Sequence, residues 1–487
     1  MKDADWMAHC EAEPLAYSGA IQPHGGLLCL DVHLSMSHVS EQIEKFVTTP
    51  LRAGDTLSDE LGAVLFPVIA TLPQVPGSRC ELFAVDSIGP LPLDIVVIRS
   101  NASIIVELIP HTVRVDAVEF AQQTVRPPAN DGEVQALHEK ISARFYELTG
   151  FDRVMVYVFR DDGDGDGEVL AETRREAVYG SYLGLRFPGS DIPAIARALY
   201  MKNPWRLIQD CQAEAVSLCS NGSAPPDLTW SDLRSVSPMH LRYLANMGVS
   251  ASLSFPIVAG GVLWGLIACH HARPRNLPLV TLCLAAREAS HYSLEISNWQ
   301  VRLQMRFNDE LTDRLNTIRR ALLRHGHALS ALTEISSIVM AQFDGCGLAV
   351  CQGDVWGVAG EVPALYELEL LDEWLESQGD ELINGCDCIG HAIHALVPVA
   401  GVLAFRLMTR RRELLSIFIF RREILHEVEW GGNPHKPVEY QQGDIMISPR
   451  RSFEKWIEKR IGYSRPWQKQ DRISAMRLRL LLVNLYC

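Results

Sequence analysis

Side chains that can hold an anionic ligand recur through the middle of the chain, in the order Arg197, Tyr200, Arg206, Arg234, Ser237, His240 and Tyr243. Guanidinium groups bind carboxylates through paired hydrogen bonds, and hydroxyl groups fill the acceptor positions that remain. This set would suit a carboxylate-bearing, extended, aromatic ligand. Ordinary surface polarity is the alternative that these residue types leave open.

Asp191 and the histidine pair that follows Cys269 each allow two interpretations. Asp191 precedes Ile192-Pro193 and the helical sequence 194–200, so its carboxylate could simply cap that helix. His270 and His271 end a strand-like stretch, where neighbouring side chains point to opposite faces and do not easily share a metal. One of them therefore faces inward, either as a core histidine or toward a ligand.

Metal and nucleophile chemistry have little support in the sequence. The acidic loop at 161–168 lacks the glutamate that a calcium loop needs at its twelfth position, where Thr173 stands. The C-D-C sequence at 386–388 has neither a second cysteine pair nor a His-x-x-x-His sequence nearby. Cys10 and His24 do not form a convincing nucleophile and base, because two glutamates beside the thiol disfavour the thiolate. No catalytic residue and no metal site are predicted.

Composition and charge restrict the partners of the chain. Its 487 residues suggest about three domains. A net charge of −14 argues against nucleic acid as the main partner. The first residues lack a secretory signal, and no apolar stretch reaches the length of about 18 residues that a membrane span needs. The twelve cysteines have no repeating spacing. We therefore expect a cytoplasmic protein with reduced thiols and no membrane partner.

Periodicity predicts two α+β domains in the first 275 residues. The strand-like runs of the first domain are 25–32, 80–86, 93–100 and 102–110, and they predict an antiparallel sheet. The second domain is predicted from a helix at 133–150, strands at 151–159 and 169–176, and a hairpin at 251–271. The hairpin turns at Ala259-Gly260-Gly261, a typical signal for a tight turn.

A long helix and a third α+β domain are predicted in the remainder. Residues 280–323 contain no glycine or proline, and their apolar side chains recur at three- and four-residue intervals, so one helix should bridge two domains. Strand candidates follow at 347–352, 394–408 and 414–423. The stretch between 423 and 453 is rich in glycine, proline, aromatic and charged residues, and so long an excursion is usually functional or disordered.

Six short motifs occur in order along almost the whole chain. After Cys10 they are I-Q-P-H-G (21–25), F-P-G-S-D-I-P-A (187–194), S-P-M-H (237–240), L-W-G-L-I-A-C-H-H (263–271), W-G-G-N-P-H-K-P (430–437) and S-P-R-R-S-F-E-K-W (448–456). Each motif alone is weak, but together they are highly specific. Their combination resembles the bacterial phytochromes.

The resemblance implies an α+β protein of three domains, PAS, GAF and PHY, joined by a long helix. We place the N-terminal segment and PAS domain at 1–114, the GAF domain at 115–300 and the PHY domain at 301–487. In this family the chain's beginning passes through a GAF loop in a figure-of-eight knot, with Ile21 at its centre. The excursion becomes a hairpin called the tongue, at about 423–453, which covers the chromophore.

The resemblance also implies biliverdin IXα, a linear tetrapyrrole, as the chromophore. In bacterial members a cysteine before the PAS domain forms a thioether with a vinyl group of biliverdin, and Cys10 matches it. Plant and cyanobacterial members instead attach the pigment inside the GAF domain, just before the histidine matched by His240. Met239 stands at that position here, which favours Cys10.

By the same resemblance, roles can be carried over residue by residue. The Asp191 backbone carbonyl in Asp191-Ile192-Pro193 and His240 should face the pyrrole nitrogens. Arg206 and Arg234 should hold the propionates, supported by Tyr200, Ser237, Ser252 and Ser254. The ring that turns on Z/E photoisomerisation should be surrounded by Tyr157, Phe187, Tyr243 and His270. Two departures are Gly189, usually alanine, and Leu185, where a polar side chain commonly contacts that ring.

The tongue residues expected to carry the signal are Trp430, Pro449, Arg450, Ser452 and Phe453. Arg450 should pair with the Asp191 carboxylate in the red-absorbing state, and rupture of this pair would provide a two-state element. Light would supply the energy for this change.

A red/far-red photoreceptor module without enzymatic activity is therefore expected. No kinase or cyclase signature follows Trp467, so the output module, such as a histidine kinase of a two-component system with its response regulator, is expected outside this chain. A homodimer through the long helix is expected as well. The alternative function is a chromophore-free GAF sensor that binds a nucleotide or acts as an interaction scaffold.

Overall fold

The protein is described here by a computed structural model that covers residues 13–113, 128–160, 165–175, 180–379, 381–393, 399–424, 426–434, 438–441, 444–447 and 453–487. Two compact units are present. The first contains Met1–Arg160, Gly165–Gln300 and Trp430–Trp456, and the second contains Asp161–Asp164, Val301–Glu429 and Ile457–Cys487. Cys10, Pro449, Arg450 and Ser452, to which the sequence assigns roles, lie outside the described residues.

The first sheet of unit one has seven strands in the order β1-β11-β3-β2-β6-β5-β4. Its elements are β1 (Ala20–Ile21), β2 (Gly26–Leu30), β3 (Met36–Ser40), α2 (Asp59–Thr71), β4 (Arg79–Val85), β5 (Leu93–Arg99), β6 (Ile104–Pro110) and β11 (Val216–Ser220). The four predicted strands are confirmed as β2, β4, β5 and β6. β11 was not predicted here, because it comes from the following domain and pairs with β3.

Alternation explains why β2 is buried along its entire length. Leu28 and Leu30 pack in the cluster that includes α2, whereas Leu27 and Cys29 on the opposite face pack in the core of the following domain. Successive side chains of a strand point to opposite faces, so this sheet is covered on both sides. The first two domains therefore share a hydrophobic core.

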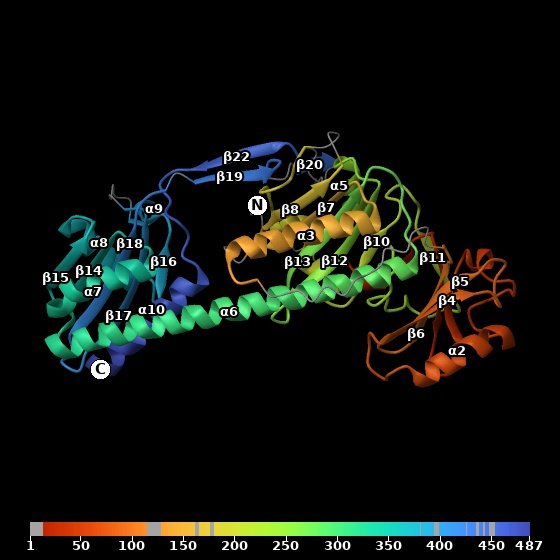
Figure 1. Ribbon diagram of the computed structural model, residues 1–487, viewed down its shortest axis with the longest axis horizontal. Coiled ribbons are helices and arrows are strands. Elements are labelled where there is room, and N and C mark those ends of the chain that lie inside the picture. Colours follow the sequence, from red (N-terminus) through yellow and green to blue (C-terminus); the bar gives the residue numbers. More distant parts are fainter. Residues whose placement is uncertain are drawn as a thin grey trace. The chain divides into compact units, whose positions relative to one another are not determined.

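The second sheet has the order β10-β12-β13-β7-β8-β9-β19-β22, and its central strands lie side by side in Figure 1. Its elements are α3 (Asp131–Thr149), β7 (Arg153–Phe159), β8 (Gly167–Arg174), β9 (Arg186–Phe187), α4 (Ala194–Tyr200), β10 (Arg206–Ile208), α5 (Pro238–Asn246), β12 (Ala251–Ala259), β13 (Val262–His271), β19 (His426–Gly431) and β22 (Lys455–Arg460). The predicted hairpin is confirmed: Gly260 and Gly261 take φ values of +61° and +79° between β12 and β13, a conformation that favours glycine.

One face of this sheet is mainly apolar. Val154 and Val156 of β7, with alternate residues of β12 and β13, pack against α3 and the first half of α6 (Leu279–His325). The predicted helix at 280–323 is confirmed as α6, a single element of 47 residues that belongs to unit one up to Gln300. These helices cover one face of the sheet. The alternate side chains of each strand, which do not contact the helices, point to the other face.

Two features differ from simple antiparallel sheets with local connections. β19, in the predicted tongue, pairs in parallel with β9 through Trp430 and Arg186. Ile21 is fully buried and forms a bridge with Arg234, and the Ala16 carbonyl accepts a hydrogen bond from the Leu228 amide at 2.8 Å. These contacts bring the N-terminal segment against the loop region through which the predicted knot would pass.

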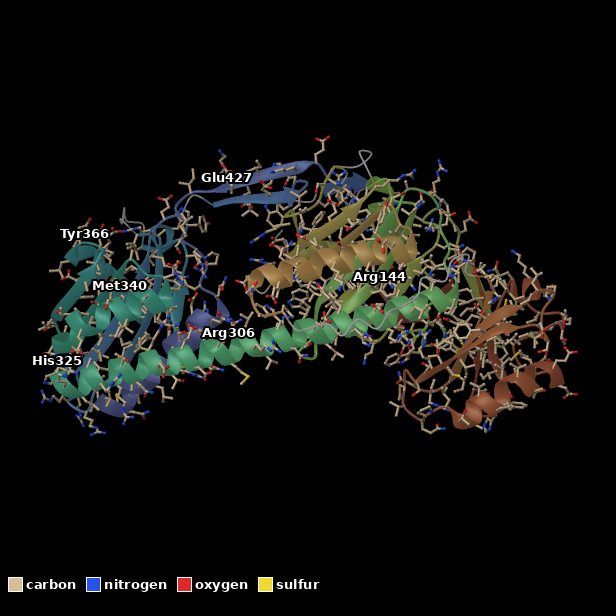
Figure 2. The ribbon with its side chains drawn as sticks, viewed as in Figure 1. Arg144, Arg306, His325, Met340, Tyr366 and Glu427 are labelled. Carbon is tan, nitrogen blue, oxygen red and sulfur yellow. The ribbon has the colours of Figure 1, made fainter. Side chains whose placement is uncertain are left out.

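Unit two is built on a five-stranded antiparallel sheet in the order β15-β14-β18-β17-β16. Its elements are α7 (Ala328–Phe343), β14 (Gly347–Gln352), β15 (Val355–Gly360), α8 (Leu365–Ser377), β16 (Asn384–Cys386), α9 (Ile389–Ile393), β17 (Gly401–Met408), β18 (Leu414–Arg421) and α10 (Lys469–Tyr486). The second half of α6, α7 and α10 share one core with this sheet. In Figure 2, His325 marks the end of α6 and Met340 lies on α7. The tongue residues include a second hairpin, β20 (Val438–Gln441) and β21 (Asp444–Ile447).

Candidate ligand pocket

A cavity opens on the face of the second sheet that the helices leave free. The cavity has a volume of about 230 Å³, and its lining is mainly apolar. Every GAF residue assigned to the ligand from the sequence lines it, namely Tyr157, Phe187, Asp191, Ile192, Pro193, Tyr200, Arg206, Arg234, Ser237, Met239, His240, Tyr243, Ser252, Ser254 and His270. Tyr157 and His270 both line the cavity, although they are more than 110 positions apart in the sequence. The fold thus brings together distant parts of the chain.

Strand alternation places much of this lining. Ser252 and Ser254 on β12 and His270 on β13 point into the cavity, whereas the intervening residues pack against the helices. His271 lies on the other side and hydrogen bonds to the Arg273 carbonyl, as the alternation predicts. The same rule would have found Met155 on β7, which sequence reasoning missed. It would also have found Leu266 and Ala268 on β13.

Two arginines supply positive charge to the cavity without a carboxylate partner. Arg206 donates to the carbonyls of Asp232, Arg234 and Ser235 at 3.1, 2.6 and 3.0 Å. Arg234 donates to the carbonyls of Leu228 and Thr229 at 3.3 and 3.1 Å. Neither guanidinium forms an ion pair among the described residues.

Burial lowers the pKa of both arginines, and the charge of Arg206 helps to lower that of Arg234 to about 9. Their charged forms are therefore destabilised until an anion approaches. Carboxylates of a ligand would stabilise the charged forms of both guanidinium groups.

The hydroxyl groups near the arginines are already engaged. Ser237 donates to the Glu13 carboxylate at 2.8 Å, a contact that sequence reasoning missed. A serine hydroxyl has one proton to donate, so a ligand carboxylate on Ser237 would have to replace Glu13. Burial raises the pKa of Tyr200, against the opposing effect of its hydrogen bond with Ser254. Tyr200 thus remains a neutral donor.

Asp191 does not cap the helix that follows it. The N-cap of α4 is Pro193 and has no side-chain hydrogen bond, so the capping interpretation is wrong. The Asp191 side chain, 8% exposed, instead accepts a hydrogen bond from the Tyr243 hydroxyl at 3.1 Å. Arg197 holds the preceding turn by donating to the Gly189 and Ile192 carbonyls at 3.0 and 2.7 Å. The turn that carries Asp191 is therefore fixed at the cavity.

Aromatic rings close one side of the cavity. Phe187 contacts Tyr157 and Tyr182 at ring-centroid distances of 6.2 and 5.7 Å, and Tyr243 contacts Phe453 of the tongue at 5.2 Å. Leu185 does not line the cavity and instead packs in the cluster around Phe187.

The tongue also reaches these rings through its backbone. Trp430 of β19 is buried, and a Cβ on the next residue, Gly431, would come within 2.5 Å of the Phe187 ring. Glycine at this position thus permits close approach of the tongue backbone.

The histidines of the cavity are neutral at physiological pH. Burial lowers the pKa of His240 to about 4, and the charge of Arg206 acts in the same direction. Burial lowers that of His270 to about 3, helped by Arg153 and His240. The His270 Nδ1 atom is buried and has no hydrogen-bond partner among the described residues, which leaves a polar atom for a ligand to satisfy.

The residues present fit a flat, conjugated ligand with two carboxylates. Apolar and aromatic walls suit a conjugated ring system, two arginines suit two carboxylates, and an unsatisfied histidine nitrogen suits a polar ring atom. Among the described residues, no group of three or more His, Cys, Asp or Glu side chains could hold a metal ion. The part of the chain that the structure describes also contains no helix long and apolar enough to cross a membrane.

Three family models match consecutive parts of the chain. They are a PAS fold at residues 10–111, a GAF domain at 133–289 and a phytochrome region at 312–487. The chain is 31% identical to cyanobacterial phytochrome B of Nostoc sp. and 32% identical to a bacteriophytochrome of Pseudomonas aeruginosa. Both matches cover 98% of this chain and 66% of the relative, so the chain spans somewhat less than two thirds of their length.

Solved structures agree over almost the full length of the chain. The wild-type photosensory core module of the Stigmatella aurantiaca phytochrome is 30% identical, with a TM-score of 0.80 and coverage of 98% of this chain and 97% of that one. A bacteriophytochrome crystal structure from R. palustris is 28% identical, with a TM-score of 0.77 and coverage of 98% and 99%. The chain therefore belongs to the phytochrome family and has the PAS, GAF and PHY architecture of a bacteriophytochrome photosensory core.

The lowered histidine pKa values predict acid sensitivity of the ligand-free protein. Because the folded pKa of His240 and His270 lies below the value of 6.5 for an unperturbed histidine, the unfolded state binds more protons at intermediate pH. Their contribution to stability is complete above about pH 6.5 and is lost as the pH falls toward about 4 for His240 and about 3 for His270, by at most about 1.4 kcal/mol per pH unit for each group.

Thermal unfolding midpoints at about pH 7.5 and pH 5 measure this effect in the wild type and in His240→Asn/His270→Asn. Both proteins lose stability through other groups, but the double variant should lose less. Equal losses in the two proteins would contradict the assignment.

Proposed function

We propose that the chain is a light photoreceptor that binds a bilin in the GAF cavity and photoconverts between red- and far-red-absorbing forms. The observation that carries this proposal is the pair of arginines in the cavity, buried Arg234 and half-buried Arg206, which form no ion pair among the described residues. A bilin is an extended conjugated molecule with two propionates, so its charge and shape match this arrangement. Membership of the phytochrome family supports the same ligand class.

Biliverdin IXα is the proposed bilin, and it supplies visible absorption and a double bond whose configuration light can change. Arg206 and Arg234 would hold its propionates, with Tyr200, Ser252 and Ser254 in support and Ser237 released from Glu13. His240 and the Asp191 carbonyl would face the pyrrole nitrogens. Tyr157, Phe187, Tyr243 and His270 would surround the isomerising ring, where neutral His270 can donate a hydrogen bond without placing a charge.

Cys10 is the proposed attachment residue. Its thiol would add across a vinyl group of the ligand, so that a sulfur–carbon bond forms and the thiol proton ends on the other vinyl carbon. Such an addition needs no oxidant or reductant. Support comes from Met239, which stands at the GAF attachment position used by other family members and lacks a nucleophilic thiol. Glu13, three residues after Cys10, lines the cavity.

Signal transfer is proposed to use the tongue. Trp430 and Phe453 contact the GAF region, and Pro449, Arg450 and Ser452 belong to the same proposed segment at about 423–453. Arg450 would pair with Asp191 in the red-absorbing form. The proposed domain limits are 1–114, 115–300 and 301–487. A cytoplasmic homodimer coupled to a histidine kinase or other output module completes the proposal, and no catalytic activity is assigned to the chain itself.

Reconstitution with biliverdin tests the photoreceptor directly. The apoprotein should acquire a red absorption band that shifts to the far red under red light and returns under far-red light. The measurement is absorption spectroscopy before and after illumination. Absence of a photoconverting band, together with a thermal shift produced by cyclic nucleotides, would replace the proposal with the chromophore-free sensor.

Cys10→Ala tests the attachment site. The variant should still bind biliverdin through the cavity but should lose the covalent link, because no other cysteine is assigned to the ligand. Zinc-enhanced bilin fluorescence on a denaturing gel should disappear while the native red band remains. Exposed Cys219→Ala serves as a matched control and should keep the fluorescence. Persistent fluorescence in Cys10→Ala would move the attachment elsewhere.

Arg450→Ala tests the tongue contact. Pigment binding should be largely intact, but the far-red-absorbing form should form in lower yield or revert several-fold faster, because the contact that distinguishes the two states is missing. Absorption after red light, followed in darkness, measures both quantities. Arg451→Ala removes the neighbouring arginine and should behave like the wild type. A normal photocycle in Arg450→Ala would remove this pair from the mechanism.

A further inference from the structure

One loop orients both arginines of the ligand pocket. Among the described residues, the hydrogen bonds that Arg206 and Arg234 donate all go to main-chain carbonyls between residues 228 and 235, at 2.6 to 3.3 Å. A guanidinium has a rigid planar set of donors, so its direction follows the direction of these carbonyls. The position of this segment, which we call the carbonyl loop (228–235), therefore decides where the two cations point.

The PAS sheet holds the carbonyl loop through Glu107. This residue lies on β6, between β2 and β5, and is 0% exposed. One of its carboxylate oxygens accepts hydrogen bonds from the Ser231 hydroxyl at 2.5 Å and from the Leu233 amide at 3.0 Å. Glu107 thus fixes the centre of the carbonyl loop from a strand in the middle of another domain's sheet.

Arg79 on β4 holds the same loop from a second direction. It donates to the Asp232 carboxylate at 2.8 Å, and its guanidinium lies 4.6 Å from the ring of Trp205, the residue before Arg206. Burial alone would lower the pKa of Arg79, but the Asp232 carboxylate and two neighbouring glutamates outweigh this effect and raise it. Asp232 in turn offers its carbonyl to Arg206. Only one residue therefore separates the PAS domain from a pocket cation.

We propose that Glu107 and Arg79 are positioning residues of the bilin site, which act from the PAS sheet by fixing the carbonyl loop and thereby aiming Arg206 and Arg234 at the ligand's carboxylates. This inference rests on the proposed function. It assigns to the PAS domain a part in recognising the propionates, although neither residue lines the cavity. Without Glu107, the Ser231 hydroxyl and Leu233 amide lose their acceptor, and the loop can shift.

Equilibrium binding of biliverdin and of its dimethyl ester tests the proposal, with Cys10→Ala present in every protein so that attachment does not obscure affinity. The ester keeps the conjugated system but lacks the carboxylates. Glu107→Ala should weaken binding of the diacid about tenfold or more, the equivalent of one charge-assisted hydrogen bond, and should leave ester binding within about twofold. Arg79→Met, which keeps packing against Trp205, should do the same.

Two further variants separate positioning from general destabilisation. Glu107→Gln keeps an acceptor oxygen for both donors and should restore diacid binding. Asp94→Ala is the matched control, because Asp94 is also a buried carboxylate of the PAS sheet. Its partners are the Ala84 amide at 3.0 Å and a ring nitrogen of His111 at 2.7 Å, and neither belongs to the carbonyl loop. This variant should reduce the thermal unfolding midpoint without changing the ratio of diacid to ester affinity.

Three results would decide against the inference or against its premise. Equal weakening of diacid and ester in both Glu107→Ala and Arg79→Met would show a merely structural role, and unchanged diacid binding would remove the role entirely. If Glu107→Ala does not unfold cooperatively, Arg79→Met and Glu107→Gln carry the comparison. A wild-type pocket that binds neither compound would instead overturn the proposed function.

Discussion

The structure of the pocket depends on two positive charges that form no ion pair among the residues that the structure describes. Arg206 and Arg234 are held by carbonyl oxygens, which satisfy the guanidinium hydrogens but contribute no formal charge. Burying a charge without a counter-ion in contact is costly, and the nearby carboxylates of Asp232 and Glu107 offset only part of this cost. A ligand that brings two carboxylates would remove this cost.

Burial and the charge of Arg206 together set the protonation state of His240. Burial is the larger effect and both lower its pKa, so His240 is available as a neutral hydrogen-bonding group. The Asp191 carboxylate accepts a hydrogen bond from Tyr243 and lies on the turn that Arg197 fixes. The lining of the pocket therefore contains both cationic and anionic side chains. An asymmetric ligand would meet different partners in its two orientations.

Much of this architecture could be predicted from the sequence, and the failures have physical reasons. The helix α6 and the Gly260-Gly261 turn follow from local rules, since apolar periodicity and backbone conformation are properties of neighbouring residues. The resemblance of the motifs to a known family identified the residues that line the cavity. The role of Asp191 was harder to predict, because an aspartate can either cap a helix or contact a ligand.

The contacts of Glu107 and Glu13 could not be predicted, because they join residues more than a hundred positions apart, as the partners Ser231 and Ser237 show. In the sequence, Glu107 is one charged residue inside the strand-like run I-I-V-E-L-I-P. Its place among apolar strand residues was the available signal, because a carboxylate buried in such a strand rarely lacks a partner. Sequence alone does not identify that partner.

The strand β11 has a consequence for how these domains can be separated or exchanged. Val216–Ser220 is encoded within the GAF region, yet it pairs with both β1 and β3 and covers an edge of the PAS sheet. A PAS fragment cut at residue 114 would expose the backbone groups of β3, and open strand edges promote association between chains. Experiments that exchange domains between proteins should therefore transfer PAS and GAF together. The strand β11 lies in the GAF region of the sequence but belongs to the PAS sheet in the structure.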